Sequence, residues 1–262
     1  MFKLVNQVFG IFVAHSHIKC STIIITCLFI NIGIGASSLS EMGTKVSLER
    51  NYTQVDPQAL SFKSGKTKCG SSCIATQWCN TWCYDQINCT LITTVVSPYY
   101  EGSSTEILTE CFTKKRTDIA FRVKSYSTLP YTPERTSNNS NSGIYFRGRK
   151  NFATSVANNP WVLYDLGKPA TIFEVRIQTA RNINYGPSYT TNIGIKIGDF
   201  LTTNGDFSTY ELFDSMIGYC KYEEVNHFTP PLPMKGQYIA IISQANSVIL
   251  SFDYIEIDGK FN

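Results

Sequence analysis

The chain has 262 residues, of which 43% are hydrophobic and 16% are charged. This composition supplies enough apolar side chains for a packed core and excludes an intrinsically disordered chain. The formal net charge is only +3, and the densest basic runs, at residues 114–116 and 147–150, are short. A nucleic-acid-binding protein is therefore excluded, because it would need a clustered basic face.

The N-terminal segment has basic, apolar and small residues in a characteristic order. Lys3 and Lys19 precede an apolar stretch at residues 23–35, and small residues follow at 36–38. This order is that of a secretory signal peptide, so we predict that residues 1–38 are removed from a secreted protein. The competing interpretation is a signal anchor, because the basic region is unusually long. The apolar stretch is nevertheless shorter than the roughly 20 residues that a membrane-spanning helix needs.

The cysteines divide the rest of the chain. Six of the nine lie between residues 69 and 111, whereas Cys220 stands alone in the C-terminal half. Dense cysteines in a short secreted segment indicate a disulfide framework. After an extended lead-in at residues 39–54, we place a first module at residues 55–117 and a second at 118–262. A zinc site is not expected, because the only histidine after the signal, His227, lies far from the cysteine cluster.

The first module carries a recognisable cysteine pattern. Two cysteines four residues apart would share one face of a helix, and the alternation after the third predicts strands. Together with a tryptophan shortly before a Tyr-Asp pair and a Cys-x-Leu, this pattern resembles the PAN/apple family. The resemblance implies a small sheet with one helix across it, which binds proteins or glycans. It also implies the disulfides Cys69–Cys89 and Cys73–Cys79, with Cys83–Cys111 as an added bridge; six cysteines allow 15 pairings.

The second module is predicted to be all β. In residues 173–178, Phe173, Val175 and Ile177 alternate with polar residues, which is the pattern of a strand with one buried face. Short runs of this kind, separated by turns rich in Gly, Pro and Asn, predict an antiparallel sandwich or barrel. The expected strands lie at residues 119–123, 161–166, 172–179, 193–197, 210–213, 238–243 and 248–257.

A second resemblance rests on residues 159–167, Asn-Pro-Trp-Val-Leu-Tyr-Asp-Leu-Gly. They are similar to the Pro-Trp-x-x-x-Asp-Leu-Gly signature of the discoidin family, the coagulation-factor C-type domains. Later segments match the following strands of that family in order. The resemblance implies a jelly-roll, galactose-binding-like β-sandwich whose loops at one end bind sugars, phospholipid headgroups or proteins. The expected fold class is thus mainly β, with this sandwich preceded by a small, disulfide-rich α+β module.

The candidate ligand site lies in loops at one end of that sandwich. The loop at residues 181–189 offers a guanidinium fork, aromatic rings and amides, which suit sugar hydroxyls and sugar faces. Two flanking loops, at residues 136–151 and 219–228, add basic side chains. The candidate residues are Arg181, Asn182, Asn184, Tyr185, Tyr189, Arg147, Arg149 and His227.

The resemblance to fucose-binding lectins of this fold group is incomplete. Arg181 matches their first basic position, whereas Ile183 and Ser188 depart from the acidic and the second basic position. No cofactor is expected. Calcium would find only neutral oxygens in the early loop, because residues 136–157 contain no acidic residue.

An enzyme is not expected. Cys220 and His227 form the only Cys–His pair after the predicted signal, and no Asp or Asn is positioned to support them. In fucose-binding lectins the partner of a comparable cysteine would fall near Asp253. Cys220 is therefore either a buried thiol or the site of an intermolecular disulfide.

The favoured function is extracellular recognition or adhesion through carbohydrate binding. Partners would be glycans or glycoproteins at a cell surface or in the matrix. The alternatives are a protein partner, bound for instance through the PAN/apple-like module, and a structural component without lectin activity that is cross-linked through Cys220. Membrane insertion is not expected, because the one apolar tip, Phe200-Leu201, has acidic neighbours. Sequons at Asn51, Asn88 and Asn138 predict a glycoprotein.

Overall fold

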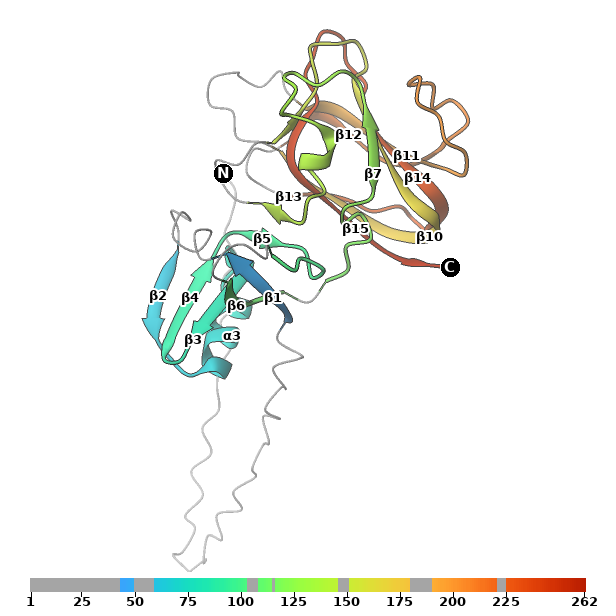
Figure 1. Ribbon diagram of the computed structural model, residues 1–262. Helices are drawn as coiled ribbons and strands as arrows, with labels where there is room; N and C mark the ends of the chain where they lie inside the picture. Colours follow the sequence, from blue (N-terminus) through green and yellow to red (C-terminus); the bar gives the residue numbers. More distant parts are fainter. Residues whose placement is uncertain are drawn as a thin grey trace, which may run out of the picture. The chain divides into compact units, whose positions relative to one another are not determined.

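Antiparallel β-sheets dominate the protein in a computed structural model. The structure describes residues 43–49, 59–102, 108–114, 116–145, 151–179, 190–220 and 225–262. Residues 37–262 belong to one compact unit. Within it, a small sheet with a helix precedes a larger sheet system (Figure 1). The expected fold class, mainly β with a disulfide-rich α+β segment before a sandwich, is confirmed.

The small sheet has five strands in the order β1-β6-β3-β4-β2. A helix, α3 (Lys66–Ala75), packs against β3 and β4 and buries Cys69, Gly70 and Cys73. Cys73 lies four positions after Cys69 and three after Gly70, so it shares with each of them the helix face that meets the sheet. The strands are β1 (Thr44–Glu49), β2 (Leu60–Lys63), β3 (Thr81–Asp85), β4 (Asn88–Ile92) and β6 (Leu108–Thr113).

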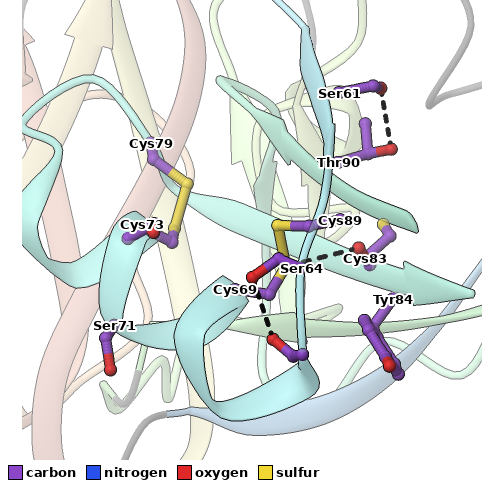
Figure 2. Close-up of a disulfide and its surroundings, with 12 residues drawn as sticks. Ser61, Ser64, Cys69, Ser71, Cys73, Cys79, Cys83, Tyr84, Cys89 and Thr90 are labelled. Atoms are coloured by element: carbon purple, nitrogen blue, oxygen red, sulfur yellow. Dashed lines mark hydrogen bonds between the residues drawn. A yellow bond between two sulfur atoms is a disulfide. The ribbon is translucent and has the colours of Figure 1, made fainter. Parts of the chain in front are cut away.

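Three disulfides staple this small sheet. Cys69–Cys89 joins the helix to β4, Cys73–Cys79 closes the end of the helix, and Cys83–Cys111 links neighbouring strands at paired positions. Figure 2 shows the first two bridges, which start from successive turns of the helix. The pairs are those that the PAN/apple resemblance implies. The first two bridges form part of a small apolar cluster in which the Trp82 and Phe112 rings stack with their centroids 4.2 Å apart. Cys83 and Cys111 belong to a second buried cluster.

The larger sheet system is built around one long strand, β10. Its strands run in the order β12-β11-β14-β10-β15-β9, and β7 and β13 also pair with β10. The strands are β7 (Lys124–Ser127), β9 (Phe152–Ala153), β10 (Trp161–Thr179), β11 (Thr191–Gly198), β12 (Glu211–Tyr219), β13 (Val225–Phe228), β14 (Met234–Ser243) and β15 (Ser251–Phe261).

The two halves of strand β10 pair with different strands of the sandwich. Its first half pairs with β7 and β14, its second half pairs with β13 and β15, and the register shifts between Asp165 and Ala170. At this shift Gly167 has φ +78° and its N–H donates to Asp165 Oδ1 over 2.8 Å. Sequence patterning predicts two strands here. The structure joins them because Gly167 allows the backbone to bulge without ending the strand.

The sandwich core consists of aliphatic and aromatic side chains from both layers. Val175 and Ile177 are fully buried, as the alternation predicts, but Phe173 is only partly buried. The expectation for Phe173 is wrong because the pairing of β10 with β15 shifts between Ile172 and Glu174. That irregularity turns Ile172 into the core instead.

The apolar core continues across residue 117, where the sequence predicts a module boundary. A short strand β5 (Val95–Val96) pairs with β8 (Ile144–Tyr145). One buried cluster contains Val46 and Leu48 from β1 together with Val96 and Ile144. Residues before and after position 117 therefore share buried surface within the compact unit. The module boundary at residue 117 remains a prediction.

Candidate functional site

A buried polar hub lies at one end of the sandwich, beside the predicted ligand loops. Its centre is Ser251, the first residue of β15. The Ser251 hydroxyl accepts a hydrogen bond from Asn151 Nδ2 over 2.7 Å and donates to the carbonyl of Phe152 over 3.0 Å. Asn151 directly follows residues 146–150. The hub thus holds the end of the loop that carries Arg147 and Arg149.

The same hub holds the second loop. The Thr190 hydroxyl donates to the carbonyl of Ser251 over 2.6 Å and accepts the Ser251 N–H over 2.9 Å. Thr190 directly follows the loop at residues 181–189, and Thr179, where β10 ends, is paired with Phe252 next to Ser251. Both flanks of this loop therefore meet at the start of β15.

The third loop is tied in through the backbone. The N–H of Cys220 donates to the carbonyl of Thr190 over 3.1 Å, and Tyr219 is paired with Thr191. On the far side of residues 221–224, Val225 is paired with Gln178 near the end of β10. The structure therefore brings together the anchors of all three loops that the sequence predicts to meet.

The start of β11 has an unusual backbone. Thr190 and Asn192 have φ values of +52° and +50°, in the left-handed region that non-glycine residues seldom adopt. The side chain of Asn192 accepts the N–H of Gly218 over 2.8 Å, and its carbonyl accepts the N–H of Gln244 over 2.8 Å. Strain of this kind persists only where the surroundings enforce it, and it concentrates at binding sites.

Most of the predicted ligand residues lie outside the described residues. These are Arg147, Arg149, Arg181, Asn182, Asn184, Tyr185 and Tyr189. By contrast, Asn151, Thr179 and Thr190, which border the two undescribed segments, are described and are held as set out above. Sequence reasoning missed Asn151, Thr190 and Ser251 as the anchors of these loops. No local pattern marks them, because each makes its bonds to residues distant in the sequence.

His227 has a different setting from the other candidates. It lies on β13 opposite Arg176 of β10, and its side chain is 60% exposed. Its Nδ1 lies 2.6 Å from Glu174 Oε1, and Glu174 Oε2 lies 3.7 Å from Arg176 Nε. His227 therefore belongs to a row of charged side chains on the sheet. Its described polar contact is with Glu174 and not with a residue of the Ser251 hub.

Two of the three sequons can be placed. Asn88 is exposed at the start of β4, next to the turn that joins it to β3. Asn138 is exposed in a single turn of 3-10 helix (Ser137–Asn139), where its Oδ1 accepts from Ser125 Oγ over 2.8 Å. Both asparagines are open to solvent, as a glycan requires. Asn51 lies outside the described residues.

The lone cysteine of the C-terminal half is buried. Cys220 is in no disulfide and lies within the sandwich core. Burial raises the pKa of its thiol to about 12. Such a thiol is protonated near neutral pH and is a poor nucleophile. Of the two alternatives that the sequence leaves open, the structure shows the buried thiol.

Two features are absent from the described residues. Among them, no three His, Cys, Asp or Glu side chains are grouped so as to hold a metal ion. None of the helices in the described part of the chain has the length and apolar character needed to cross a membrane. Phe200 and Leu201, the apolar tip noted in the sequence, are exposed beyond the end of β11.

Comparison with solved structures finds partial matches, each over about half of this chain. A fucolectin from striped bass serum matches with a TM-score of 0.47 and 19% identity, over 55% of this chain and 49% of that one. This chain thus covers about half the length of that lectin. A fucose-binding module from Streptococcus pneumoniae matches with a TM-score of 0.45 and 15% identity, over 56% of this chain and 98% of the module.

A chitosan-binding module from a Paenibacillus chitosanase/glucanase matches with a TM-score of 0.43 and 10% identity. The match covers 54% of this chain and 98% of that module. No protein-family model matches the chain, and no curated protein matches it either. At these identities the side chains that bind a ligand are not shared in general, so the ligand has to be deduced from this chain's own residues.

Proposed function

We propose that this chain is an extracellular recognition protein that binds carbohydrate through the loops at the Ser251 end of its sandwich. The observation that carries the proposal is the buried hub of Asn151, Thr190 and Ser251. It gathers the ends of three loops, two of which hold nearly all of the candidate ligand residues. Convergence of several loops on one rigid end of a β-scaffold is how such scaffolds build binding sites.

The composition of the loops favours a hydroxyl-rich ligand. Residues 146–150 and 181–189 contain three arginines, two asparagines and two tyrosines, and no acidic residue. Arginine forks and amides donate to sugar hydroxyls, and tyrosine rings cover the apolar face of a sugar. Because no carboxylate is present in these loops, the site would tolerate neutral and acidic sugars better than cationic ones.

The disulfides support an extracellular location. Three bridges lie within the small sheet at residues 69–111. Such bridges form and persist in oxidising compartments and are rare in the cytosol. The predicted signal at residues 1–38 and the exposed sequon asparagines Asn88 and Asn138 agree with that location. Adhesion through glycans or glycoproteins on cells or in the matrix is the function that this setting would serve.

A glycan array tests the proposal. Purified residues 39–262 would be screened with and without calcium, and each hit would be competed with the free sugar. We expect a competable signal that does not need calcium. Arg181→Ala should lower it at least tenfold, since one lost charged hydrogen bond is worth about 1.5–3 kcal/mol. Lys235→Ala, an exposed lysine on β14, is the matched control and should bind normally.

Two results would contradict the proposal. A blank array with a folded protein would refute carbohydrate binding and favour a protein partner. An equal signal from Arg181→Ala and the native protein would place any sugar site elsewhere than in these loops. Circular dichroism of each variant distinguishes a lost site from a lost fold.

A further inference from the structure

A row of charged side chains lies on the outer face of the second half of β10 and β15, and its centre is buried. The Glu256 side chain is 2% exposed, and its two oxygens face two arginines. Oε1 lies 2.8 Å from Arg116 Nε, and Oε2 lies 3.5 Å from Arg176 Nε. Glu174 and His227 extend the row on the far side of Arg176. A buried carboxylate with two cationic partners is strongly tied to its neighbours, because losing either would leave it uncompensated.

Arg116 connects this row to the small sheet. Its Nη2 donates to the carbonyl of Val96 over 3.1 Å and to Thr113 Oγ1 over 3.2 Å. On the sandwich side, Arg176 Nη2 donates to the carbonyl of Thr117 over 3.4 Å. Glu256 therefore holds β15 against β5 and the end of β6.

A second buried carboxyl lies next to Glu256. Asp118 is 1% exposed, and its Oδ1 accepts the N–H of Ala120 over 3.2 Å. Its Oδ2 is fully buried beside the Ser97 hydroxyl, and that hydroxyl and the backbone of Ile257 favour the ionised form of Asp118 only in part against its burial. The other titratable group facing Asp118 is Tyr145 of β8, which stacks on Tyr254 of β15 with ring centroids 4.7 Å apart. An ionised Asp118 would place a second buried negative charge here, beside the charge of Glu256.

The proton equilibrium of Asp118 follows from this packing. Burial, and then the negative charge of Glu256, raise the pKa of Asp118 to about 7. Burial also raises the pKa of Glu256, against the opposing effect of Arg116 and Arg176. A carboxyl whose pKa is higher in the folded state than in the unfolded state stabilises the fold at acidic pH, where it carries its proton. That stabilisation is lost as the pH rises from about 4 through about 7.

We propose that Asp118 and Glu256 form a proton-controlled clasp between β15 and the β5–β8 contact. A proton on Asp118 keeps the clasp closed at mildly acidic pH. Its loss leaves two neighbouring buried carboxylates and loosens the pairing of Val95 and Val96 with Tyr145 and Ile144.

Hydrogen exchange read by mass spectrometry tests the clasp in residues 39–262 at pH 5.5 and pH 8.0. Protection of peptides that cover residues 94–97 and 143–145 is divided by protection of a peptide from the centre of β11, which removes the intrinsic effect of pH on exchange. With an ordinary pKa for Asp118 in the open state, the opening equilibrium should rise up to about 30-fold between the two pH values.

Asp118→Asn removes the titrating group and should abolish this change, whereas Asp199→Asn, an exposed control beyond β11, should retain it. The proposal is overturned if the native ratio does not change with pH, or if it changes equally in Asp118→Asn. Should that variant not fold, carbon-detected carboxyl titration of the native protein decides the question. A midpoint for Asp118 near neutrality supports the clasp, and a midpoint below pH 5 refutes it.

Discussion

Replacing Thr190 by valine isolates the bond that holds the predicted ligand loop at the hub. Valine has nearly the same shape and the same branching at Cβ, so the strain of the left-handed backbone at position 190 is unchanged. What is lost is the hydroxyl, which makes two buried hydrogen bonds with the Ser251 backbone at 2.6 and 2.9 Å. The variant therefore reports on the hub and not on packing.

The magnitude follows from the two groups left without a partner. A buried N–H or carbonyl that loses its bond costs about 1–3 kcal/mol, and partial relaxation of the loop reduces the sum, so we expect about 2–4 kcal/mol. For a protein of this size each kcal/mol of lost stability lowers the melting temperature by about 2–4 °C, so the fall should be roughly 4–16 °C. Calorimetry and urea unfolding measure both quantities.

The control is Thr203→Val, at an exposed position in the loop after β11. It should change stability by less than about 0.5 kcal/mol. If Thr190→Val also costs less than about 0.5 kcal/mol, the hub does not secure this end of the sandwich. If the Thr190→Val variant is destabilised as expected but binds every ligand on the array with unchanged affinity, the hub has a structural role only. It would then have no part in ligand binding by the loops.

Three further predictions concern other buried groups. Replacing Cys83 and Cys111 together by alanine should lower the free energy of unfolding by about 3–4 kcal/mol, measured by urea denaturation, because their bridge closes a long loop; an unchanged midpoint would contradict this. Arg116→Met should cost about 3–5 kcal/mol by leaving Glu256 without its nearer partner, whereas Glu256→Gln in the same background should recover part of the loss. Cys220 should react with a thiol reagent only after unfolding, since its thiol is buried and its pKa is about 12; rapid reaction in the native protein would show that the site opens.

Features encoded by neighbouring residues could be predicted from the sequence. The helix at residues 66–75 follows from two cysteines four positions apart, because that spacing gives one buried face. Strands β11 and β14 follow from alternating apolar residues, because a sheet with one buried face imposes a period of two. The pairing of the six cysteines came from family resemblance, since local spacing alone leaves many pairings open.

Other features were decided only by contacts between distant segments. Whether residues 161–179 form one strand or two depends on β14 and β15, which hold both halves and turn Ile172 rather than Phe173 into the core. Likewise, His227 lies in a predicted ligand segment, yet its described polar partner is Glu174 on β10. Alternation within a segment cannot show such outcomes, because a single bulge reverses the side that every later residue faces.

The candidate site shows the same division. The sequence by itself determined which chemistry is available, namely arginines, asparagines and tyrosines in loops without acidic residues. Only the tertiary structure decided that these loops are anchored together, because Asn151, Thr190 and Ser251 lie up to 100 positions apart in the chain. Each of the three is an ordinary polar residue locally. Their role arises because burial removes water as an alternative partner, so that they must satisfy one another's hydrogen bonds.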